Sequence, residues 1–112
     1  MKEIKAYVKA HKLDAVTLAL HRIEGLTGMS VNEVRGFGRS RERRQQSLAE
    51  QVSEFVRHVK IEVVCRDEVA DAVIEAIRQG ARTGLRGDGK IYISDVLDAV
   101  RIETGERGQN AV

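Results

Sequence analysis

Residues 81–93 read Ala81-Arg82-Thr83-Gly84-Leu85-Arg86-Gly87-Asp88-Gly89-Lys90-Ile91-Tyr92-Ile93. Because glycine has no Cβ, backbone N–H groups in such a loop can turn toward one another and form a concave nest. Arginine and lysine side chains add the positive charge that phosphate groups bind. The stretch therefore indicates an anion cradle of the kind that holds a nucleotide. A glycine-rich turn that only joins two elements is the alternative, and the loop alone does not decide between them.

The same stretch also fits the start of the P-loop pattern, from Gly84 to Lys90. The next position of that pattern is Ser or Thr, whose hydroxyl binds magnesium, whereas here it is Ile91. A P-loop also follows a strand and opens a helix, but this loop follows a helical pattern and opens a strand pattern. We therefore reject the P-loop interpretation and retain a phosphate cradle of another kind.

Hydrophobic periodicity on both sides of the loop predicts an α+β fold. Ile4, Ala6 and Val8 alternate with polar residues, as in a half-buried strand, and Asp67 suits the N-cap of the second helix. The order βαββαβ is that of the ferredoxin-like fold, an antiparallel sheet with two helices on one face. The expected elements are strands over 2–9, 29–35 and 58–65, a last strand from 91 to about 101, and helices over 12–24 and 68–81.

Polar side chains are expected on the sheet face that the helices leave open. Tyr7, Lys9, Lys60 and Glu62 alternate with the apolar residues of their strands. A sheet face that carries these groups suggests contact with a ligand or with other subunits.

A long polar segment separates the second and third strand patterns. It runs from Gly36 to about Arg57, whereas hairpin loops usually have two to five residues, so its length indicates a functional or mobile loop. Leu48, Val52 and Phe55 recur at helical spacing in its second half. They suit a helix that binds a partner, and a place in the core is the alternative.

Composition places the chain among single-domain globular proteins. It has 112 residues, is 42% hydrophobic and 32% charged, and carries a net charge of +2, which is too small to argue for nucleic acid. The single cysteine, Cys65, excludes an internal disulfide and fits a reducing compartment. The sequence has no apolar run long enough to span a membrane and no signal peptide, so a cytoplasmic location is expected.

Three further classes of site have weaker support. The arginine-rich start of the long segment could bind nucleic acid, but acidic residues are interspersed and no aromatic stacking platform lies nearby. His11, His21 and His58 lie on different predicted elements without ligand spacing, so no metal site is expected. No catalytic constellation is suggested. Asp88, between two glycines, is expected to be a turn residue or a hydroxyl acceptor rather than a base.

Six short segments, in the correct order, resemble the PII signal transduction proteins, the trimeric regulators of nitrogen metabolism. The resemblance covers nearly the whole chain. The segments are Lys12-Leu13-Asp14 at a helix start, Leu26 to Val31 at the entry to the second strand, Gly36-Phe37-Gly38-Arg39 at the base of the family's long T-loop, Val59 to Val64 in the third strand, Thr83-Gly84 with Gly87 to Ile91 in its B-loop, and Arg101-Ile102 with Thr104-Gly105-Glu106 in its C-loop.

The resemblance implies a single PII-like domain over residues 1–112 that forms a homotrimer. Its T-loop would span residues 38–57, its B-loop 82–90 and its C-terminal loop 102–112. ATP and ADP would compete for clefts between subunits, and Mg²⁺ could accompany ATP. The implied phosphate contacts are Gly38, Arg39, Thr83, Gly87, Asp88, Gly89 and Lys90, with Gly36 at the base of the T-loop. The neighbouring subunit would contribute Tyr7, Gly28, Ser30, Glu62 and Val64 on the adenosine side, and Arg101 would complete the phosphate shell.

The chain also departs from the family's pattern. Ser40 replaces a glutamine that helps bind magnesium and 2-oxoglutarate, and His58 replaces the lysine that pairs with the 2-oxoglutarate carboxylate. Glu103 replaces a second arginine and would repel phosphate. The tyrosine that is uridylylated in many bacterial members is missing, since none lies between Phe37 and Tyr92. The departures indicate a divergent member, in which ADP or AMP could be favoured and in which 2-oxoglutarate sensing and covalent modification are not expected.

The expected function is regulation of a partner, without catalysis and without nucleic acid. A bound adenine nucleotide would order or release the long loop by shifting its population of conformations. The partner would be a metabolic enzyme or a membrane transporter for ammonium, metal or bicarbonate. The alternative is a trimer of the same fold that binds a metal or a small anion, such as bicarbonate, instead of nucleotide. The partner-binding residues expected in the long loop are Arg41, Arg43, Arg44, Leu48, Val52 and Phe55.

Overall fold

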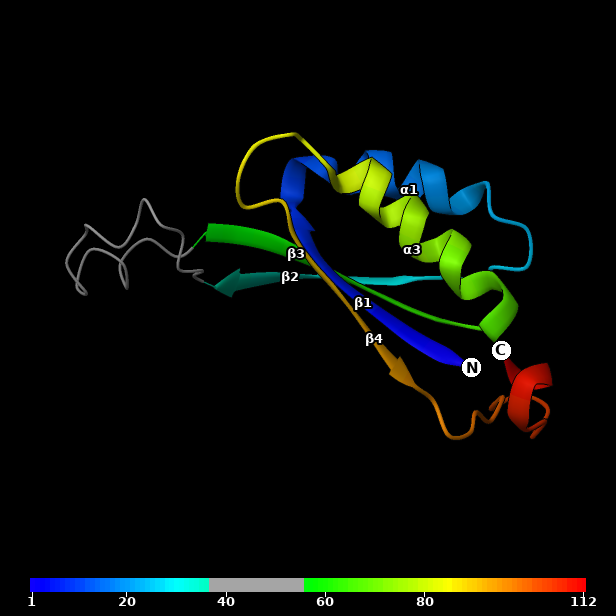
Figure 1. The fold of residues 1–112 in the computed structure, drawn as a ribbon. Helices are drawn as coiled ribbons and strands as arrows, with labels where there is room; N and C mark the ends of the chain where they lie inside the picture. The colour runs from blue at the N-terminus through cyan, green and yellow to red at the C-terminus, as the bar shows by residue number, and fades with distance from the viewer. Residues whose placement is uncertain (37–55) are drawn as a thin grey trace.

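The structure, a computed structural model, describes residues 1–36 and 56–112. The chain begins with strand β1 (Lys2–Lys9), a short 3-10 helix (Ala10–Lys12) and helix α1 (Leu13–His21). Strands β2 (Ser30–Gly36) and β3 (Val56–Cys65) follow, and then come helix α3 (Asp67–Ala81), strand β4 (Gly89–Asp95) and a last 3-10 helix (Gly108–Ala111), as Figure 1 shows. This is the predicted βαββαβ order.

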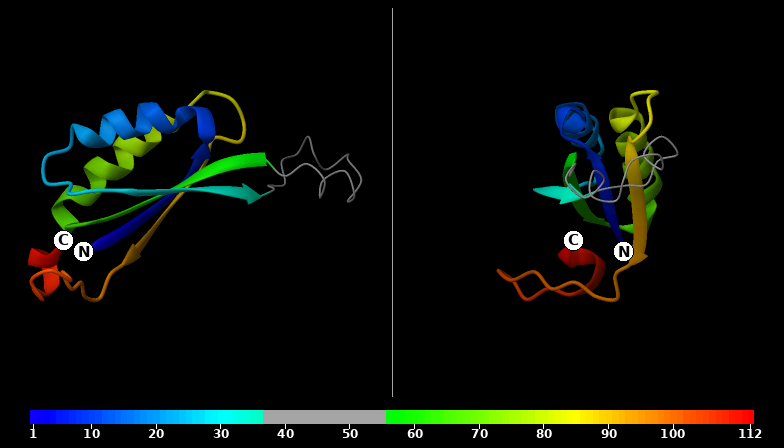
Figure 2. Two further views of the ribbon diagram at one scale, coloured as in Figure 1. Left: turned by 180° about the vertical axis from the view of Figure 1, so that it is seen from behind. Right: turned by 90° about the vertical axis from the view of Figure 1, so that its left-hand side faces the viewer.

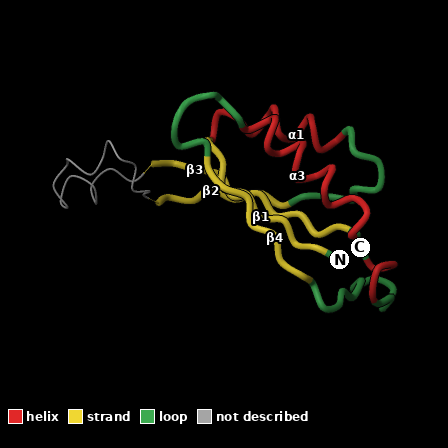
Figure 3. The backbone as a smooth tube through the Cα atoms, in the orientation of Figure 1, coloured by secondary structure: helices red, strands yellow, loops and turns green. Residues whose placement is uncertain are grey.

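The four strands form one antiparallel sheet in the order β2-β3-β1-β4. Helices α1 and α3 cover the same face of this sheet. No helix in the described ranges lies on the other face, which we call the open face (Figures 1 and 3). The register places Tyr7 of β1 opposite Lys60 of β3 and Lys90 of β4. The predicted ferredoxin-like architecture is confirmed.

The hydrophobic core lies between the sheet and the two helices. Alternation along β1 and β3 directs one apolar side chain in every two toward the helices, as the sequence pattern predicts. Gly80 lets α3 approach α1 closely, since an added Cβ would lie only 3.0 Å from the Cα of Val16. The buried residues are Ile4, Ala6, Val8, Val16, Leu20, Val59, Ile61, Val63, Cys65, Ala70, Val73, Ile77 and Ala81.

Several predicted element boundaries are wrong: α1, for example, ends at His21 and not at residue 24, and β3 begins at Val56 and not at residue 58. Asp67 is the first residue of α3 and not its N-cap; the N-cap is Arg66, which makes no side-chain capping bond. The Asp67 carboxylate pairs instead with the amino group of Met1 at 2.9 Å, a contact that local sequence rules cannot foresee. Strand β4 ends at Asp95 rather than near residue 101, and beyond it only an isolated bridge joins Val100 to Arg107.

The long loop between β2 and β3 lies outside the described residues, which stop at 36 and resume at 56. Because β3 begins at Val56, the last two residues of the predicted T-loop belong to a strand. The predicted C-terminal loop contains the 3-10 helix Gly108–Ala111. No helix within the described ranges is long and apolar enough to cross a membrane.

The two ends of the sheet carry different connections. The loop between α3 and β4 lies at one end, and the segment after Asp95 lies at the other end, beside the N-terminus (Figures 1 and 2). There the amide of Val96 donates a hydrogen bond to the carbonyl of Met1 at 3.1 Å. Seven residues of β4 separate these connections, which corresponds to roughly 20 Å at the usual rise per residue.

Candidate functional site

The B-loop, residues 82–90, connects α3 to β4 by a path that requires glycine. The φ angles of Gly84, Gly87 and Gly89 are +81°, +80° and +108°. Residues with a Cβ rarely adopt these values, so the backbone path alone accounts for the three glycines. Whether the loop also suits an anion depends on the side chains that surround it.

Asp88 closes the B-loop on itself. Its Oδ2 accepts a hydrogen bond from the backbone amide of Thr83 at 2.9 Å, and its Oδ1 accepts one from the Thr83 hydroxyl. The hydroxyl oxygen in turn accepts a bond from the amide of Leu85 at 3.0 Å. The Thr83 hydroxyl, then the Thr83 amide and Lys9, lower the pKa of Asp88 from 3.8 to about 2. The prediction that Asp88 is a hydroxyl acceptor is confirmed.

Lys9 ties the B-loop to the end of β1, and the predicted site residues do not include it. Its Nζ lies 3.2 Å from Oδ1 of Asp88 and 3.5 Å from the hydroxyl oxygen of Thr83. The Lys9 side chain is only 22% exposed. Its stem passes beside Gly87, where an added Cβ would lie 4.0 Å from Lys9 Cε. Strand alternation places Lys9 on the open face, which is the only signal for it in the sequence.

Strand pairing fixes the last residues of the B-loop against β1. Val8 pairs with Gly89, and Tyr7 pairs with Lys90. Lys90 is exposed on the open face and makes no ion pair with any residue in the ranges 1–36 and 56–112. An available ammonium group next to a glycine-rich loop is suited to bind phosphate.

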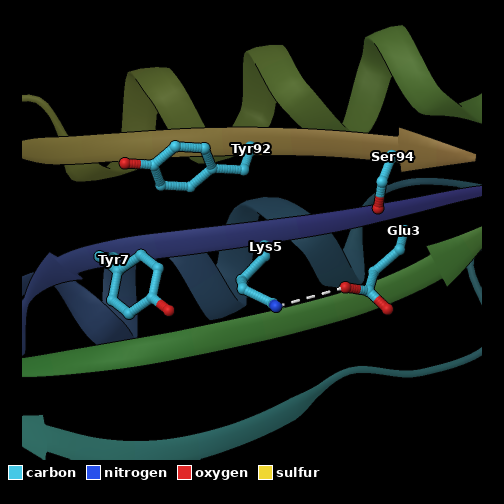
Figure 4. A pocket seen from close by; sticks show the side chains of 5 residues that line it. All are labelled: Glu3, Lys5, Tyr7, Tyr92 and Ser94. Atoms are coloured by element: carbon cyan, nitrogen blue, oxygen red, sulfur yellow. Dashed lines mark ion pairs between the residues drawn. The ribbon is translucent and has the colours of Figure 1, made fainter.

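An open depression of about 360 Å³ lies on the open face of the sheet. Glu3, Lys5 and Tyr7 of β1 line it together with Tyr92 and Ser94 of β4 (Figure 4). The rings of Tyr7 and Tyr92 meet edge to face, with centroids 6.1 Å apart and an interplanar angle of 83°. Nζ of Lys5 lies 3.5 Å from Oε1 of Glu3. The open face therefore combines aromatic rings with charges of both signs.

Further predicted site residues share this face. Glu62 lies opposite Ser30 of β2 and two residue pairs along from the Tyr7–Lys60 pair, on the same face of the sheet. Nζ of Lys60 lies 2.9 Å from Oε1 of Glu62, and their hydrogen bond raises the pKa of Lys60 and lowers that of Glu62. A ligand that binds Glu62 must compete with this pair. The predicted residues that share the open face are Tyr7, Ser30, Glu62, Val64 and Lys90, but Val64 lies four residue pairs from the Tyr7–Lys90 pair.

Arg101 does not join them in a single chain, because it lies in the segment beyond the far end of β4. Its amide donates to the carbonyl of Glu106 at 2.9 Å, and its carbonyl accepts from the amide of Gly105 at 2.7 Å. Asp98 closes this C-terminal loop by accepting hydrogen bonds from the Arg107 guanidinium and from two backbone amides. The guanidinium holds the pKa of Asp98 below its usual range. Arg101 therefore sits on an ordered loop, away from its own B-loop.

Two further predicted residues, Gly28 and Gly36, lie at opposite ends of β2. Gly28 precedes β2, and Gly36 ends β2 opposite Val56, at the same end of the sheet as the B-loop. No group of three or more His, Cys, Asp or Glu side chains in the described part of the chain is placed to hold a metal. The residues that fall outside the described ranges are Gly38, Arg39, Arg41, Arg43, Arg44, Leu48, Val52 and Phe55.

Comparisons with known proteins agree with this geometry. The family model for nitrogen regulatory protein P-II matches residues 1–106. The chain is 50% identical to a nitrogen regulatory protein P-II of Rhizobium meliloti and 48% identical to one of Rhodospirillum rubrum, over 113 aligned residues that cover all of both chains. A crystal structure of Arabidopsis thaliana PII bound to citrate is similar with a TM-score of 0.81 and 38% identity, over 99% of this chain and 91% of that one. This chain therefore belongs to the nitrogen regulatory protein P-II family.

Proposed function

We propose that this PII protein binds an adenine nucleotide, ATP or ADP, at the B-loop end of its sheet and uses it to control a partner protein through the long loop between β2 and β3. Members of the family are signal-transducing regulators of nitrogen metabolism and not enzymes. The family also forms trimers, binds adenine nucleotides and small effectors, and acts on partner proteins. The ligand, the cleft and the partner of this chain are the proposal.

The observation that carries the proposal is the arrangement of the B-loop and Lys90. The loop is fixed at one end by Asp88 and Thr83 and at the other by pairing with β1. Lys90 lies next to it, is exposed, and makes no ion pair with a residue that the structure describes. A fixed glycine-rich loop can present backbone N–H groups to phosphate without the entropy cost of ordering it first.

The position of Arg101 supports a cleft between two subunits of a homotrimer. Roughly 20 Å of β4 separates the C-terminal loop from the B-loop of the same chain. Arg101 could therefore reach a phosphate on the B-loop only if that B-loop belonged to a second copy. We assign Gly28, Ser30, Glu62, Val64 and Arg101 to one side of the cleft and the B-loop to the other. The resemblance assigns Tyr7 to the neighbouring subunit, but Tyr7 pairs with Lys90 of its own chain, so we move it to the B-loop side.

The base of the long loop supports a route from ligand to partner. Gly36 ends β2 at the B-loop end of the sheet, so a nucleotide held there would lie near the point where the long loop leaves the sheet. We assign partner binding to that loop, with Gly38 and Arg39 at the nucleotide and Arg41, Arg43, Arg44, Leu48, Val52 and Phe55 at the partner. A membrane transporter or a metabolic enzyme is the proposed partner.

Thermal unfolding in the presence of ATP, ADP and AMP, each with and without Mg²⁺, tests the proposal. A nucleotide at 100 times its Kd should add about 2.7 kcal/mol to the free energy of unfolding. Lys90→Ala should remove most of this stabilisation. Lys2→Ala is the matched control, because Lys2 lies on β1 at the other end of the sheet, where it pairs with Asp95.

Parallel titrations with 2-oxoglutarate and with bicarbonate separate the alternatives. Stabilisation by bicarbonate but by no adenine nucleotide would replace the nucleotide proposal with a small-anion sensor. If no adenine nucleotide stabilises the protein at concentrations up to millimolar, the proposal is contradicted.

A further inference from the structure

Lys9 is a cation from β1 that contacts the B-loop network. Its ammonium group lies within 3.5 Å of both Asp88 and Thr83, and these two residues already bond to each other. The side chains of Lys9 and Asp88 are 22% and 25% exposed, which is low for charged groups at a loop. The three residues form what we call the Lys9 clasp: Lys9, Thr83 and Asp88.

We propose that Lys9 is a positioning residue for the nucleotide site, which holds the B-loop in its ligand-ready shape through Asp88 and Thr83. This inference rests on the proposed function. It separates the tasks of two lysines at adjacent strand ends: Lys90 binds the ligand, and Lys9 shapes the loop that receives it.

Charge gives the first reason for this division. Asp88 is ionised throughout the neutral pH range, and an isolated carboxylate inside a phosphate site would repel the ligand. The Lys9 ammonium at 3.2 Å offsets that charge within the loop. Lys90, with no ion pair in the part of the chain that the structure describes, is left to add net positive charge.

Geometry gives the second reason. The Thr83 hydroxyl donates to Asp88 and accepts from the Leu85 amide, so one residue links the start of the loop to its turn. Lys9 contacts this link from β1, and its stem lies beside Gly87. Strand pairing fixes the same end of β1 to Gly89. Contacts from β1 therefore fix the loop before and after Gly87, where the backbone N–H groups of an anion-binding nest must keep their orientation.

Lys9→Met tests the inference, since it removes the ammonium group and keeps most of the apolar stem. ADP affinity, measured by titration calorimetry, should fall roughly tenfold, the size of one lost charge-assisted contact. Lys9→Arg should restore affinity to within about threefold, because the charge returns. Lys2→Met, on the same strand with its own carboxylate partner, should leave affinity unchanged.

Amide hydrogen exchange in the ligand-free protein isolates the positioning role. The amides of Thr83 and Leu85 are bonded inside the clasp and should exchange faster in Lys9→Met, while amides in the centre of β3 should not change. Exchange at Thr83 and Leu85 that stays at the wild-type rate would overturn the inference, even if affinity fell, because Lys9 would then be a direct ligand.

A double-mutant cycle with Asp88→Asn tests the coupling itself. If Lys9 acts through Asp88, the double variant should lose much less affinity than the sum of the two single losses. Additive losses would overturn the inference. A wild type that binds no adenine nucleotide would instead contradict the proposed function, and the exchange rates at Thr83 and Leu85 would still show whether Lys9 holds the loop.

Discussion

The backbone of Gly89 lies directly against the carbonyl group of Tyr7: a Cβ added to Gly89 would stand 1.7 Å from that oxygen. The same residue has a φ of +108°, which side-chain-bearing residues rarely adopt. Close approach and backbone conformation both require glycine at the point where the B-loop becomes β4. This close contact lies at the point where the candidate phosphate loop joins β1, an inner strand of the sheet.

Gly89→Ala should therefore destabilise the protein by about 2–4 kcal/mol, since it combines backbone strain with a clash against a main-chain atom that cannot move aside. Chemical denaturation measures this change. Gly84→Ala is the control, because Gly84 has a similar φ of +81° but no atom within 4 Å of an added Cβ. It should cost only about 1–2 kcal/mol. Equal costs for the two variants would show that the contact with Tyr7 does not matter.

The pH dependence of stability should report the Asp88 bonds to Thr83 and Lys9. The pKa of Asp88 is lowered to about 2 in the folded protein from an ordinary value of 3.8. Stability from a lowered carboxyl pKa is fully present above the unfolded pKa and is lost as pH falls through the folded pKa. Wild type should therefore exceed Asp88→Asn in stability near pH 5, and the difference should shrink as pH falls from about 4 to about 2.

Thermal unfolding of both proteins across that range checks the expectation. Asp71→Asn is a control, because Asp71 is exposed on α3 and makes no ion pair within the described ranges. Its curve should run parallel to that of the wild type. A difference between wild type and Asp88→Asn that stays constant down to pH 2 would mean that the carboxylate makes no such bonds in solution.

Exposed apolar side chains predict where subunits meet. Leu97 and Ile102 in the C-terminal segment are each 99% exposed in a single chain. Burying each of them against another copy would contribute about 2 kcal/mol. Leu97→Asp and Ile102→Asp should thus convert the proposed homotrimer to smaller species in light scattering. Leu18→Asp, on the outer side of the helix layer and 60% exposed, should leave the mass at three chains. A trimer that survives both C-terminal substitutions would place the interface elsewhere.

Local pattern predicts the elements of this fold well because each strand and helix follows its own periodicity. The alternation of Ile4, Ala6 and Val8 is visible in β1 as three buried positions. The pattern predicts an element boundary incorrectly where the residue at that boundary contacts a segment that is distant in the sequence. Asp67 reads as a helix cap, yet it starts α3 and pairs with the amino group of Met1. Capping rules consider only residues near the helix start in the sequence, so they cannot predict a contact with Met1.

The candidate site divides in the same way. Glycine spacing and Lys90 identify the B-loop from the sequence, since turn chemistry is local. Strand alternation places Lys9 on the open face, but its contact with the B-loop is missed, because a lysine at a strand end is usually solvated and its partner Asp88 comes close only when β4 pairs with β1. The proposed role of Arg101 also cannot be predicted from one chain. The fold separates Arg101 from the B-loop of the same chain, so the two could share a site only between two subunits.

Mixing two inactive variants should restore nucleotide binding if the site lies between subunits. Lys90→Ala removes the cation on the B-loop side of the proposed cleft, and Arg101→Ala removes the one on the C-terminal side. Each homotrimer should bind ADP at least tenfold more weakly than the wild type, the loss expected for a charge-assisted contact to phosphate. When the two are unfolded together and refolded, random assembly should leave about one quarter of the interfaces with both residues intact.

Titration calorimetry of the mixture should then show that fraction of sites with wild-type affinity. The argument depends on symmetry: a site made by two chains takes Lys90 from one and Arg101 from the other, whereas a site within one chain always keeps its own defect. Mixing the two folded homotrimers without unfolding is the control and should restore nothing at first. Failure of the co-refolded mixture to regain any tight sites, with mixed trimers verified by mass spectrometry, would place Lys90 and Arg101 in the same chain's site or remove one of them from it.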